Sequence, residues 1–430
     1  MKLFAVTGNP ILFSKSPLIF STAFQQDAKH DHAYIRIAAN TAAEALCLAT
    51  ELGVSGLNIT APFKEDFCNY CQSLSADAAT IGAVNTLISQ QTDNTTTWTG
   101  HNTDPDGVLF ALQKHRHLEQ HTNHRAVILG NGGAARACIA ACERTEIPYT
   151  LLARTNSLGA ILFDAQEAEN IFQQATIVIS TIPPHVALPD TFTFHPDTLV
   201  LDATYKTKSL LIERAEQHGI AVASGLDWLL GQAIKNFALF THQSIAPHTI
   251  HDVRQALAAQ SIQAEKSIYL IGLMGAGKSA TLSALASLGY TTIDTDAEIE
   301  RSTGQSIAQI FATKGEQAFR EIEFQVLKDA RADFIACGGG IITHAPSRAY
   351  LKTQGTCFWL WAALDVLEQR LSHDTSRPLL QQRPLKASLK DLLIERIELY
   401  VQTADIVIRS DTRTPLELAQ KIVYEINSTR

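Results

Sequence analysis

The stretch around residues 268–279 constrains the fold of this chain more than any other. Its apolar run Ile268–Ile271 precedes a complete G-x-x-x-x-G-K-S pattern, which extends from Gly272 to Ser279. Glycines let backbone N–H groups curl around phosphate oxygens without Cβ clashes, and the N-terminus of the helix that follows attracts the same anion. The stretch therefore predicts a phosphate-binding loop between a strand and a helix.

The polar groups of this loop are expected to contact a bound nucleoside triphosphate or its Mg²⁺ ion. Lys278 supplies a mobile cation for the β- and γ-phosphates, and the Ser279 hydroxyl is a Mg²⁺ ligand. The backbone of Gly275, Ala276 and Gly277 would surround the phosphates. A chance glycine-rich turn is the alternative, but the strand before the loop and the helix after it argue against that interpretation.

The bulk composition describes a chain of more than one compact domain. With 430 residues, of which 46% are hydrophobic and 18% charged, the sequence predicts two or three domains and argues against disorder. The net charge of −8 disfavours a nucleic-acid partner. Apolar runs are too short for a transmembrane helix, residues 1–10 lack a signal-peptide core, and seven scattered cysteines suggest reduced thiols, so we expect a cytoplasmic protein.

Two cysteine and histidine patterns leave alternatives open. Cys68 and Cys71 form a C-x-x-C, which is compatible with a redox pair, but the second pair that a zinc site would require is missing. Four histidines between His115 and His124 are compatible with a metal-binding tract. We favour a solvated helix end and loop there, because no cysteine or carboxylate cluster accompanies the histidines.

The first hundred residues place polar side chains at the ends of expected elements. Ser14 and Ser16 stand at the entrance of a helix expected over residues 17–26, where they would cap the helix or clamp a carboxylate. Lys64 follows a strand expected over residues 56–59. It is either a solvated lysine or, if burial lowers its pKa, an acid/base group.

Two further polar residues are ambiguous when each is considered alone. Asp104 precedes a helix expected over residues 105–113, which it could cap. Because Pro105 follows directly, we expect extended backbone at Asp104. Gln232 lies in an amphipathic helix expected over residues 225–240, where it is either exposed or faces a substrate.

The pattern then changes to that of a dinucleotide-binding unit. A strand expected over residues 126–129 runs into Gly130–Ala135, which has the pattern G-x-G-x-x-A, and a helix and a second strand follow. At the end of that second strand, where an NAD-binding protein would carry an acidic residue, stands Arg154. An arginine there fits the 2′-phosphate of NADP. The same parallel sheet would continue in strands expected over residues 177–180 and 199–203.

The segment after residue 289 carries charged groups at intervals that suit phosphate transfer. Asp294 and Asp296 lie two apart at a strand end, so one suits the Mg²⁺ shell and the other an acceptor hydroxyl. Bare backbone at Gly338–Gly340 permits the close approach of a small ligand. Several arginines, each of which could be a solvated charge when taken alone, complete the pattern: Arg320, Arg370, Arg377 and Arg396.

Motifs in two blocks carry family resemblances. Residues 1 to about 260 resemble shikimate dehydrogenase over their whole length, through GNPILFSKSP, NITAPFK, GAVNT, GHNTD, GNGGAAR, ART, DATY and GLDWLLGQA. Residues 267–430 resemble shikimate kinase, through GLMGAGKS, DTD, GEQAFR, GGG, RPLL and RIELY. The chain is thus similar to a bifunctional fusion, which implies NADPH-dependent reduction of 3-dehydroshikimate to shikimate, followed by phosphorylation of shikimate with ATP and Mg²⁺.

The first resemblance implies roles for residues of the dehydrogenase block. Lys64, assisted by Asp104, would be the acid/base. The substrate would be bound by Ser14, Ser16, Thr60, Lys64, Asn85, Asp104, Tyr205 and Gln232. NADP(H) would be bound by Gly130, Asn131, Gly132, Gly133, Ala134, Arg154, Thr155 and Gly225. Asn131 and Ala153 depart from the family's usual alanine and asparagine, and Ala153 is expected to loosen the adenosine site.

The second resemblance implies roles in the kinase block. Ser279 and Asp294 would hold Mg²⁺, and the catalytic residues would be Lys278, Asp296 and Arg377, of which Arg377 closes over the phosphates as a lid. Shikimate would be bound by Asp296, Arg320, Gly338, Gly339, Gly340 and Arg396. ATP would be bound by Gly275, Ala276, Gly277, Lys278 and Ser279, with Arg370 and Arg413 flanking the adenine.

These patterns predict an α/β fold with three domains. They are an α/β substrate domain of residues 1–105, completed by 226–260, a Rossmann-like NADP domain of residues 106–225, and, after a short linker at 261–265, a P-loop kinase domain with a parallel sheet, residues 266–430. Three alternatives stay open. One half could have become a binding or regulatory module, the dehydrogenase could prefer quinate, or shikimate could pass directly between the two sites.

Overall fold

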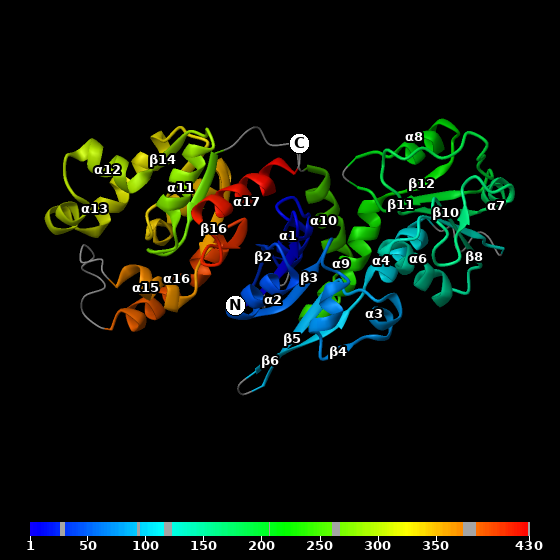
Figure 1. Cartoon of the computed structure of the whole chain (residues 1–430), viewed down its shortest axis with the longest axis horizontal. Helices are drawn as coiled ribbons and strands as arrows, with labels where there is room; N and C mark the ends of the chain where they lie inside the picture. The colour runs from blue at the N-terminus through cyan, green and yellow to red at the C-terminus, as the bar shows by residue number, and fades with distance from the viewer. Residues whose placement is uncertain are drawn as a thin grey trace. The chain divides into compact units, whose positions relative to one another are not determined.

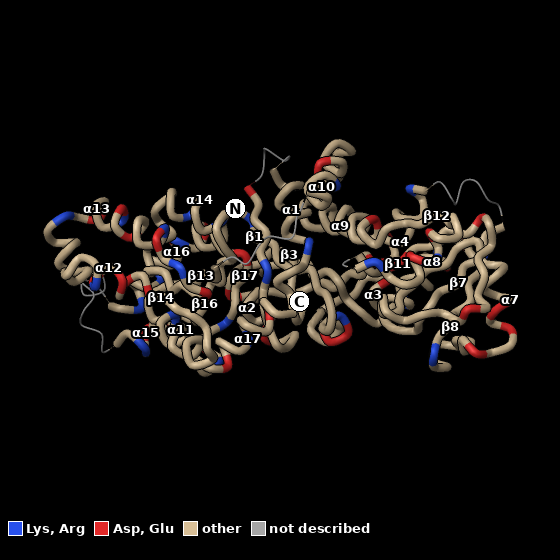
Figure 2. The backbone as a smooth tube through the Cα atoms, turned by 90° about the horizontal axis from the view of Figure 1, so that it is seen from above, with Lys and Arg blue, Asp and Glu red and all other residues tan. Residues whose placement is uncertain are grey.

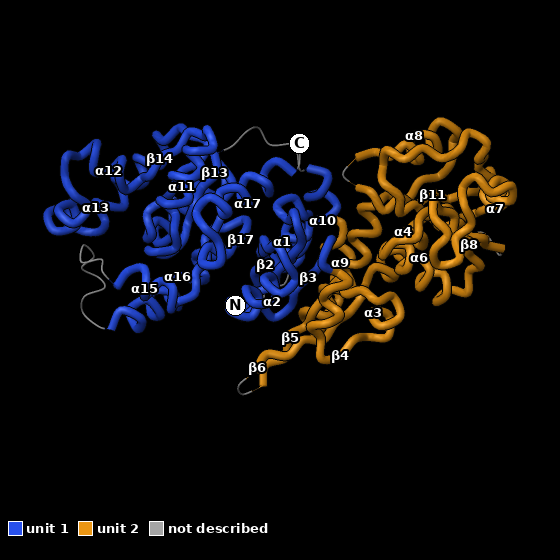
Figure 3. The backbone as a smooth tube through the Cα atoms, viewed as in Figure 1, with its two compact units in different colours: residues 1–63, 252–430 blue, residues 64–251 orange. Residues whose placement is uncertain are grey.

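The computed structural model describes residues 1–25, 31–92, 95–115, 123–205, 207–259, 267–372 and 384–428. The chain divides into two compact units: unit 1 comprises residues 1–63 and 252–430, and unit 2 comprises residues 64–251 (Figure 3). The predicted α/β fold class is confirmed. The expected linker at 261–265 lies outside the described residues, and the division into three domains stays a prediction.

Charged residues of both signs are interspersed along the described backbone (Figure 2). The chain has 35 lysines and arginines against 43 aspartates and glutamates, which gives the net charge of −8. Among the helices that the structure describes, none combines the length and the apolar character that a bilayer-spanning segment requires.

Unit 1 is built on a parallel sheet to which both ends of the sequence contribute strands (Figure 1). The strands follow the order β14 (Thr292–Asp294), β15 (Phe334–Ala336), β13 (Ser267–Ile271), β16 (Gly355–Trp361), β17 (Ile406–Arg409), β2 (His32–Ala38), β1 (Lys2–Gly8) and β3 (Val54–Ile59). Every neighbouring pair in this order is parallel. All four residues of β17 are buried, as expected for a parallel strand covered on both faces.

Helices connect these strands, because parallel neighbours need crossover connections. The N-terminal segment contributes α1 (Ser16–Gln25) and α2 (Ala42–Glu51). The C-terminal segment contributes α11 (Lys278–Ser287), α12 (Thr295–Thr303), α13 (Ile307–Asp329), η2 (Ile341–Thr343), α14 (Ala345–Gln354), α15 (Leu364–Leu371), α16 (Leu385–Thr403) and α17 (Pro415–Asn427), and α10 (Pro247–Ala259) leads into it. The last helix, α17, packs against α11, which begins at the phosphate-binding loop.

The junction between β17 and β2 joins the two ends of the sequence in one sheet. Ile406 pairs with Arg36, Val407 with Ile37 and Ile408 with Ala38. Strands β14, β15, β13, β16 and β17 would form a complete parallel sheet alone, with the phosphate-binding loop after its central strand β13. The junction therefore extends that sheet directly into the strands of the first sixty residues.

Unit 2 contains a second parallel sheet, in the order β12 (Ala221–Ala223), β11 (Leu199–Asp202), β10 (Ile177–Ser180), β7 (Ala126–Leu129), β8 (Tyr149–Ala153) and β9 (Ile161–Leu162). Numbered along the chain, this is 6-5-4-1-2-3, the order of doubly wound dinucleotide-binding sheets. Ala126 and Ile128 face one apolar cluster and Val127 and Leu129 the other, so both faces of β7 are buried. Ligands of such sheets bind where the strand order reverses, and Gly130 follows β7 at that point.

Unit 2 contains further strands and helices that are not part of this six-stranded sheet. An antiparallel pair is formed by β5 (Thr86–Thr92) and β6 (Thr95–His101), and β4 (Ser73–Leu74) pairs parallel to β6. The helices are η1 (Asp66–Tyr70), α3 (Ala76–Ile81), α4 (Asp104–Lys114), α6 (Gly133–Arg144), α7 (Ala168–Gln173), α8 (Leu210–Gln217) and α9 (Gly225–Thr241).

Close packing of α4 against α9 depends on two glycines. A Cβ at Gly107 would lie 2.5 Å from the Trp228 side chain, and one at Gly231 would lie 2.5 Å from Phe110 Cβ and 2.9 Å from Gly107 Cα. An ion pair between Lys114 and Asp227, at 2.9 Å, ties the end of α4 to the start of α9. This packing brings the middle of α9 beside the first turn of α4.

Replacing Gly231 with alanine tests this packing. Alanine favours the helix by about 1 kcal/mol, but its methyl group would meet Cα and Cβ atoms of α4, and overpacking costs about 1–3 kcal/mol. Because the clashing atoms are a Cβ and a backbone Cα, which cannot rotate away, the cost should lie in the upper half of that range. We therefore expect a net loss of about 1–2 kcal/mol in unfolding free energy, together with faster hydrogen exchange in α4 and α9. The matched control Lys235→Ala changes an exposed position of the same helix and should leave both unchanged. A Gly231→Ala variant as stable as the parent would contradict the packing argument.

Candidate active sites

Lys64 and Asp104 form a close ion pair in unit 2. Lys64 Nζ lies 2.5 Å from Asp104 Oδ2, and the two side chains are 31% and 8% exposed. The α-helix begins at Asp104 itself, and Thr103 occupies the N-cap. The expectations that Asp104 caps the helix and has extended backbone are therefore wrong. Contacts with Lys64, and the bond from its own N–H to Asn102 Oδ1 at 3.0 Å, outweigh the bias that Pro105 imposes.

Asn85 connects this pair to α9. Its Nδ2 donates to Asp104 Oδ1 at 3.1 Å and to Gln232 Oε1 at 3.2 Å. Its Oδ1 accepts the Thr103 N–H at 3.0 Å, which fixes which way the amide points. Gln232 is half-buried in this arrangement, so the structure brings Lys64, Asn85, Asp104 and Gln232 together.

Thr86 and Asn236 belong to the same network, although the sequence analysis does not single them out. The hydroxyls of Thr86 and Thr103 donate to Asn236 Oδ1 at 2.7 and 2.9 Å. Asn236 lies four residues after Gln232 on α9, and that helical spacing was the signal in the sequence that could have found it. Buried polar groups that are all bonded make the site rigid.

An ammonium group beside a buried carboxylate can serve as a positioned proton donor. An ammonium group has three N–H donors, and the bond to Asp104 accounts for one of those on Lys64, so others can face a ligand oxygen. The carboxylate holds the ammonium group in one orientation. The arrangement can therefore bind an oxygen atom of a ligand and deliver a proton to it.

Ser14, Ser16 and Thr60 lie in unit 1. Ser16 is the first residue of α1, and its N–H donates to Ser14 Oγ at 3.3 Å. Thr60 follows β3, and its N–H donates to the Thr7 carbonyl at 2.9 Å. Burial raises the pKa of Tyr34, which hydrogen-bonds to Ser16 and, at 2.6 Å, to Asn58. These hydroxyls and the N-terminus of α1 suit a small anion.

The glycine loop of unit 2 has the backbone that the dinucleotide pattern requires. Gly130 has a φ of 106°, and a Cβ there would lie 2.5 Å from Thr181 Oγ1. Gly132 is the N-cap of α6. Asn131, the departure from the family pattern, donates from Nδ2 to Thr155 Oγ1 at 2.9 Å and to Ser157 Oγ at 2.7 Å. This amide therefore ties the glycine loop to the loop after β8.

The remaining candidate residues of unit 2 lie at ends of strands and helices. Arg154 follows β8 and is exposed, next to Thr155. Gly225 starts α9, where a Cβ would lie 2.7 Å from the carbonyls of Asp202 and Thr204. Tyr205 follows β11, and burial raises its pKa.

The phosphate-binding loop of unit 1 curls as its glycines allow. Gly272, Gly275 and Gly277 have φ values of 152°, 79° and 92°, which favour glycine, and α11 begins at Lys278. Lys278 Nζ donates to the carbonyls of Gly272 at 2.8 Å and Leu273 at 3.0 Å. The lysine therefore folds back over the loop, and the N-terminus of α11 faces the same space.

Oxygen groups beside this loop suit a magnesium ion. Ser279 Oγ donates to Asp294 Oδ2 at 2.7 Å, and Asp294 Oδ1 accepts the Asp296 N–H at 3.0 Å. Hydroxyl and carboxylate oxygens are the ligands that Mg²⁺ prefers. Asp294 is the N-cap of α12, which fixes its direction. These residues fit Mg²⁺, and Asp296 lies beside them.

The Gly338–Gly340 turn lies against the candidate ligand-binding side chains of unit 1. A Cβ at Gly338 would lie 2.7 Å from Asp296 Oδ1, and one at Gly340 would collide with the Arg320 guanidinium group. The Gly339 carbonyl accepts bonds from Arg396 Nη1 at 3.3 Å and from Tyr400 Oη at 3.0 Å. The structure therefore brings Asp296, Arg320, Arg396 and this turn together.

Glu323 is a buried carboxylate in this site that the sequence analysis missed. Its Oε2 accepts Arg320 Nη1 at 2.7 Å, and its side chain is 1% exposed. It lies one turn after Arg320 on α13, and this spacing was the available signal. Burial raises the pKa of Glu323 to about 7, although Arg320 opposes the shift.

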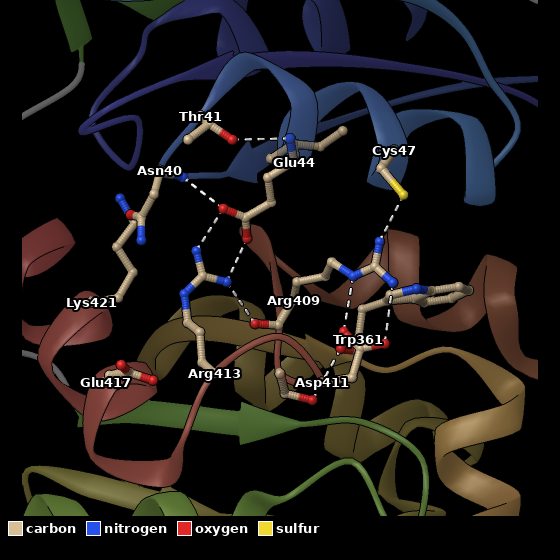
Figure 4. Close-up of polar contacts among 12 residues, drawn as sticks. Asn40, Thr41, Glu44, Cys47, Trp361, Arg409, Asp411, Arg413, Glu417 and Lys421 are labelled. Atoms are coloured by element: carbon tan, nitrogen blue, oxygen red, sulfur yellow. Dashed lines mark hydrogen bonds and ion pairs between the residues drawn. The ribbon is translucent and has the colours of Figure 1, made fainter.

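Arg370 lies in the last turn of α15 and contacts the phosphate-binding loop, and Arg413 lies between β17 and α17. Arg370 donates to the Gly275 carbonyl at 2.9 Å and to the Ser410 carbonyl at 3.4 Å. Arg413 forms a bidentate ion pair with Glu44 of α2, at 2.5 and 2.8 Å, and donates to the Arg409 carbonyl (Figure 4). The predicted lid residue Arg377 lies outside the described residues.

The cysteine and histidine patterns gain no support. Cys68 and Cys71 are free thiols, and burial raises the pKa of Cys71 to about 11, whereas reactive thiols have lowered pKa values. Among the described residues, no group of three or more histidine, cysteine, aspartate or glutamate side chains could hold a metal ion. Part of the histidine tract, residues 116–122, lies outside them.

The pH dependence of stability tests the burial of Glu323. Its pKa is higher in the folded state, about 7, than the ordinary value of 4.5, so the folded chain binds the proton more tightly. This group therefore lowers the free energy of unfolding as pH rises from 4.5 to 7, by at most about 1.4 kcal/mol per pH unit.

In Glu323→Gln this group cannot titrate. The free energy of unfolding of the variant, relative to that of the parent, should therefore rise as pH increases from 4.5 to 7. Urea unfolding at pH 5, 6, 7 and 8 measures the difference. The exposed neighbour variant Glu321→Gln should follow the parent at each pH. Parallel curves for the parent and Glu323→Gln would refute the shifted pKa.

Comparisons with known proteins agree with the two blocks. Residues 274–427 match the family described as shikimate kinase, and residues 6–87 match the shikimate dehydrogenase substrate binding domain. The shikimate kinase of Nitrosospira multiformis is 42% identical over 165 residues, which are 37% of this chain and 84% of that relative. That of Acinetobacter baumannii is 39% identical over 178 residues, which are 40% of this chain and 99% of the relative.

Solved structures resemble the rest of the chain. Shikimate 5-dehydrogenase from Thermus thermophilus, in complex with NADP(H) and shikimate, is 25% identical with a TM-score of 0.50, and the likeness covers 60% of this chain and 100% of that one. A dehydroquinate dehydratase and shikimate dehydrogenase from S. pombe, 23% identical with a TM-score of 0.51, shows the fold alone, and this chain spans 53% of it. The chain therefore belongs to the shikimate kinase family through its C-terminal part, and with the shikimate dehydrogenase domain that precedes this part it is a bifunctional enzyme of the shikimate pathway.

Proposed function

We propose that the chain catalyses two successive reactions, the NADPH-dependent reduction of 3-dehydroshikimate and the ATP-dependent phosphorylation of the shikimate formed. The observation that carries the proposal is the Lys64–Asp104 pair at 2.5 Å, together with the Ser279–Asp294 bond at 2.7 Å beside a complete phosphate-binding loop. Each block therefore has a polar centre of its own. The hydroxyl that the first reaction makes would be the one that the second esterifies.

In the reduction, Lys64 delivers a proton to the oxygen of the substrate ketone while the carbonyl carbon becomes tetrahedral. Asp104 keeps the ammonium group oriented and lies beside the site where positive charge leaves the lysine. NADPH supplies the hydride when it is bound. The substrate ring would be held at its hydroxyls by Thr60, Asn85, Asp104, Tyr205 and Gln232, and at its carboxylate by Ser14 and Ser16.

The NADP(H) site is proposed at the glycine loop of unit 2. Gly130, Gly132 and Gly133 expose backbone and the N-terminus of α6 to a pyrophosphate, and Asn131 and Ala134 complete the loop. Arg154, with Thr155, offers a cation to a 2′-phosphate at the end of β8. Gly225 packs closely against the carbonyls of residues 202 and 204, and the nicotinamide would lie near it.

In the phosphorylation, Asp296 orients the acceptor hydroxyl, and Arg320, Arg396 and Gly338–Gly340 hold the ring and carboxylate of shikimate. Lys278 neutralises charge on the transferred phosphoryl group. Ser279 and Asp294 would hold Mg²⁺, which would neutralise negative charge on the phosphates of ATP. The adenine would lie between Arg370 and Arg413, with Arg377 closing over the phosphates.

Lysine variants separate the two reactions. Given 3-dehydroshikimate, NADPH and Mg·ATP, the parent should form shikimate 3-phosphate. Lys64→Ala should lose about 10²- to 10⁴-fold in the rate of reduction, because the proton donor is gone, yet phosphorylate added shikimate normally. Lys278→Ala should accumulate shikimate.

The exposed Lys314→Ala serves as the control and should match the parent in both reactions. Liquid chromatography with mass detection follows all three compounds. If either lysine variant keeps its reaction, the corresponding block works differently or serves as a binding module. A higher kcat/KM for quinate than for shikimate, measured in the oxidative direction, would instead identify a quinate dehydrogenase.

Arg154→Gln tests the choice of cofactor. A charged hydrogen bond is worth about 1.5–3 kcal/mol, so the KM for NADPH should rise about 10- to 100-fold. The KM for NADH should change little, because NADH has no 2′-phosphate. Arg125→Gln, an exposed arginine of the same unit, is the matched control. If the KM for NADPH and the KM for NADH rise by the same factor, Arg154 does not contact a 2′-phosphate.

A further inference from the structure

The loop that leads to Ser14 is held by the last helix of the kinase block. Glu425, on α17, is fully buried, and its Oε2 accepts the backbone N–H groups of Ile11 at 2.7 Å and of Leu12 at 3.0 Å. A carboxylate binds N–H donors more strongly than a neutral acceptor does. The backbone two residues before Ser14 is therefore fixed by a residue more than four hundred positions further along the chain.

Lys421 completes this contact one turn earlier on α17. Its Nζ donates to Glu425 at 2.8 Å and to Asn9 Oδ1 at 2.7 Å, and its side chain is 6% exposed. Buried charges are costly unless each is paired and hydrogen-bonded, and both conditions hold here. The pair thus holds three points of the loop, at Asn9, Ile11 and Leu12.

Arg36 fastens the same loop at Ser14 itself. Its Nη2 donates to the Ser14 carbonyl at 2.9 Å, and its Nη1 donates to the Asp405 carbonyl at 3.1 Å. Asp405 immediately precedes β17, so this second link also ends in the kinase block. The backbone before Ser14 and the carbonyl of Ser14 are therefore both anchored to residues after position 400.

We propose that Glu425 is a positioning residue for the dehydrogenase, because it sets the loop of residues 9–16 so that Ser14 and Ser16 are ready for the substrate carboxylate. The inference rests on the proposed function for the role of these two serines. Without Glu425, the N–H groups of Ile11 and Leu12 would turn to other partners, and substrate binding would include the cost of ordering the loop. The kinase block thus supplies part of the substrate-binding apparatus of the dehydrogenase.

Glu425→Gln in the full chain tests this inference. The amide keeps the size of the side chain but presents N–H groups as well as an oxygen and leaves Lys421 without its counter-charge. We expect the KM for 3-dehydroshikimate to rise about ten-fold or more, with the KM for NADPH unchanged. Hydrogen exchange at the amides of Ile11 and Leu12 should become faster. Gln420→Ala, at an exposed position of α17, is the matched control and should leave all these quantities unchanged.

A second variant separates positioning from stability. Replacing Lys421 with methionine and Glu425 with leucine removes both charges together, which often preserves stability. The leucine cannot accept the two N–H groups, so the KM for 3-dehydroshikimate should stay raised in a chain with the parent's melting temperature. If the double variant has the parent's KM for 3-dehydroshikimate, the inference is overturned. It is also overturned if the KM values for NADPH and for the kinase substrates rise by the same factor as that for 3-dehydroshikimate.

These measurements distinguish failure of the positioning role of Glu425 from failure of the proposed function. If the parent chain does not reduce 3-dehydroshikimate, the assignment of the reaction fails, and exchange at Ile11 and Leu12 still decides whether Glu425 holds the loop. Unchanged exchange in Glu425→Gln excludes the positioning role whatever the reaction is. Faster exchange with an unchanged KM means that the loop is held but does not position the substrate, and this too overturns the inference.

Discussion

The parallel ladder between β17 and β2 is the contact on which unit 1 depends. Each of these strands would otherwise end a sheet, β17 that of the phosphate-binding fold and β2 that of the first sixty residues. An unpaired strand edge leaves backbone N–H and C=O groups without partners and invites association with other chains. Pairing the two edges satisfies both and makes the first and last parts of the sequence one compact body.

Charged groups on either side of this ladder fix its register. Arg409 contacts Glu51 at 3.0 Å. It also contacts Asp411 at 2.8 Å, and Arg413 is paired with Glu44 (Figure 4). Partly buried ion pairs contribute little net stability, but a misplaced partner would leave a charge unpaired at a cost of several kcal/mol. The pairs of Arg409 with Glu51 and of Arg413 with Glu44 therefore select one alignment of α2 on the loop after β17, whereas Asp411 holds Arg409 from within that loop. That loop also contacts the phosphate-binding loop through Arg370, so the nucleotide side and the N-terminal helix are parts of one network.

Features encoded by neighbouring residues were predictable from the sequence, and long-range features were not. The glycine loops were predictable because a backbone that curls around a phosphate requires glycines at that spacing. The helix expected over 225–240 from its amphipathic pattern is observed as Gly225–Thr241. The β17–β2 junction has no local signature, since any buried strand can pair with any other. Glu323 and Glu425 likewise look like solvated helix positions until the fold buries them. The start of α4 at Asp104 shows a tertiary contact overriding a local bias.

The junction between β17 and β2 also bears on why these two catalytic segments share one polypeptide. As separate chains they would have to find each other at cellular concentrations through a ladder of only three residue pairs and a few side chains. Covalent linkage replaces that encounter with an intramolecular one at high effective concentration. A junction that would be too weak to hold two separate proteins together can then persist at any dilution. The residues at this junction therefore need not form a high-affinity interface.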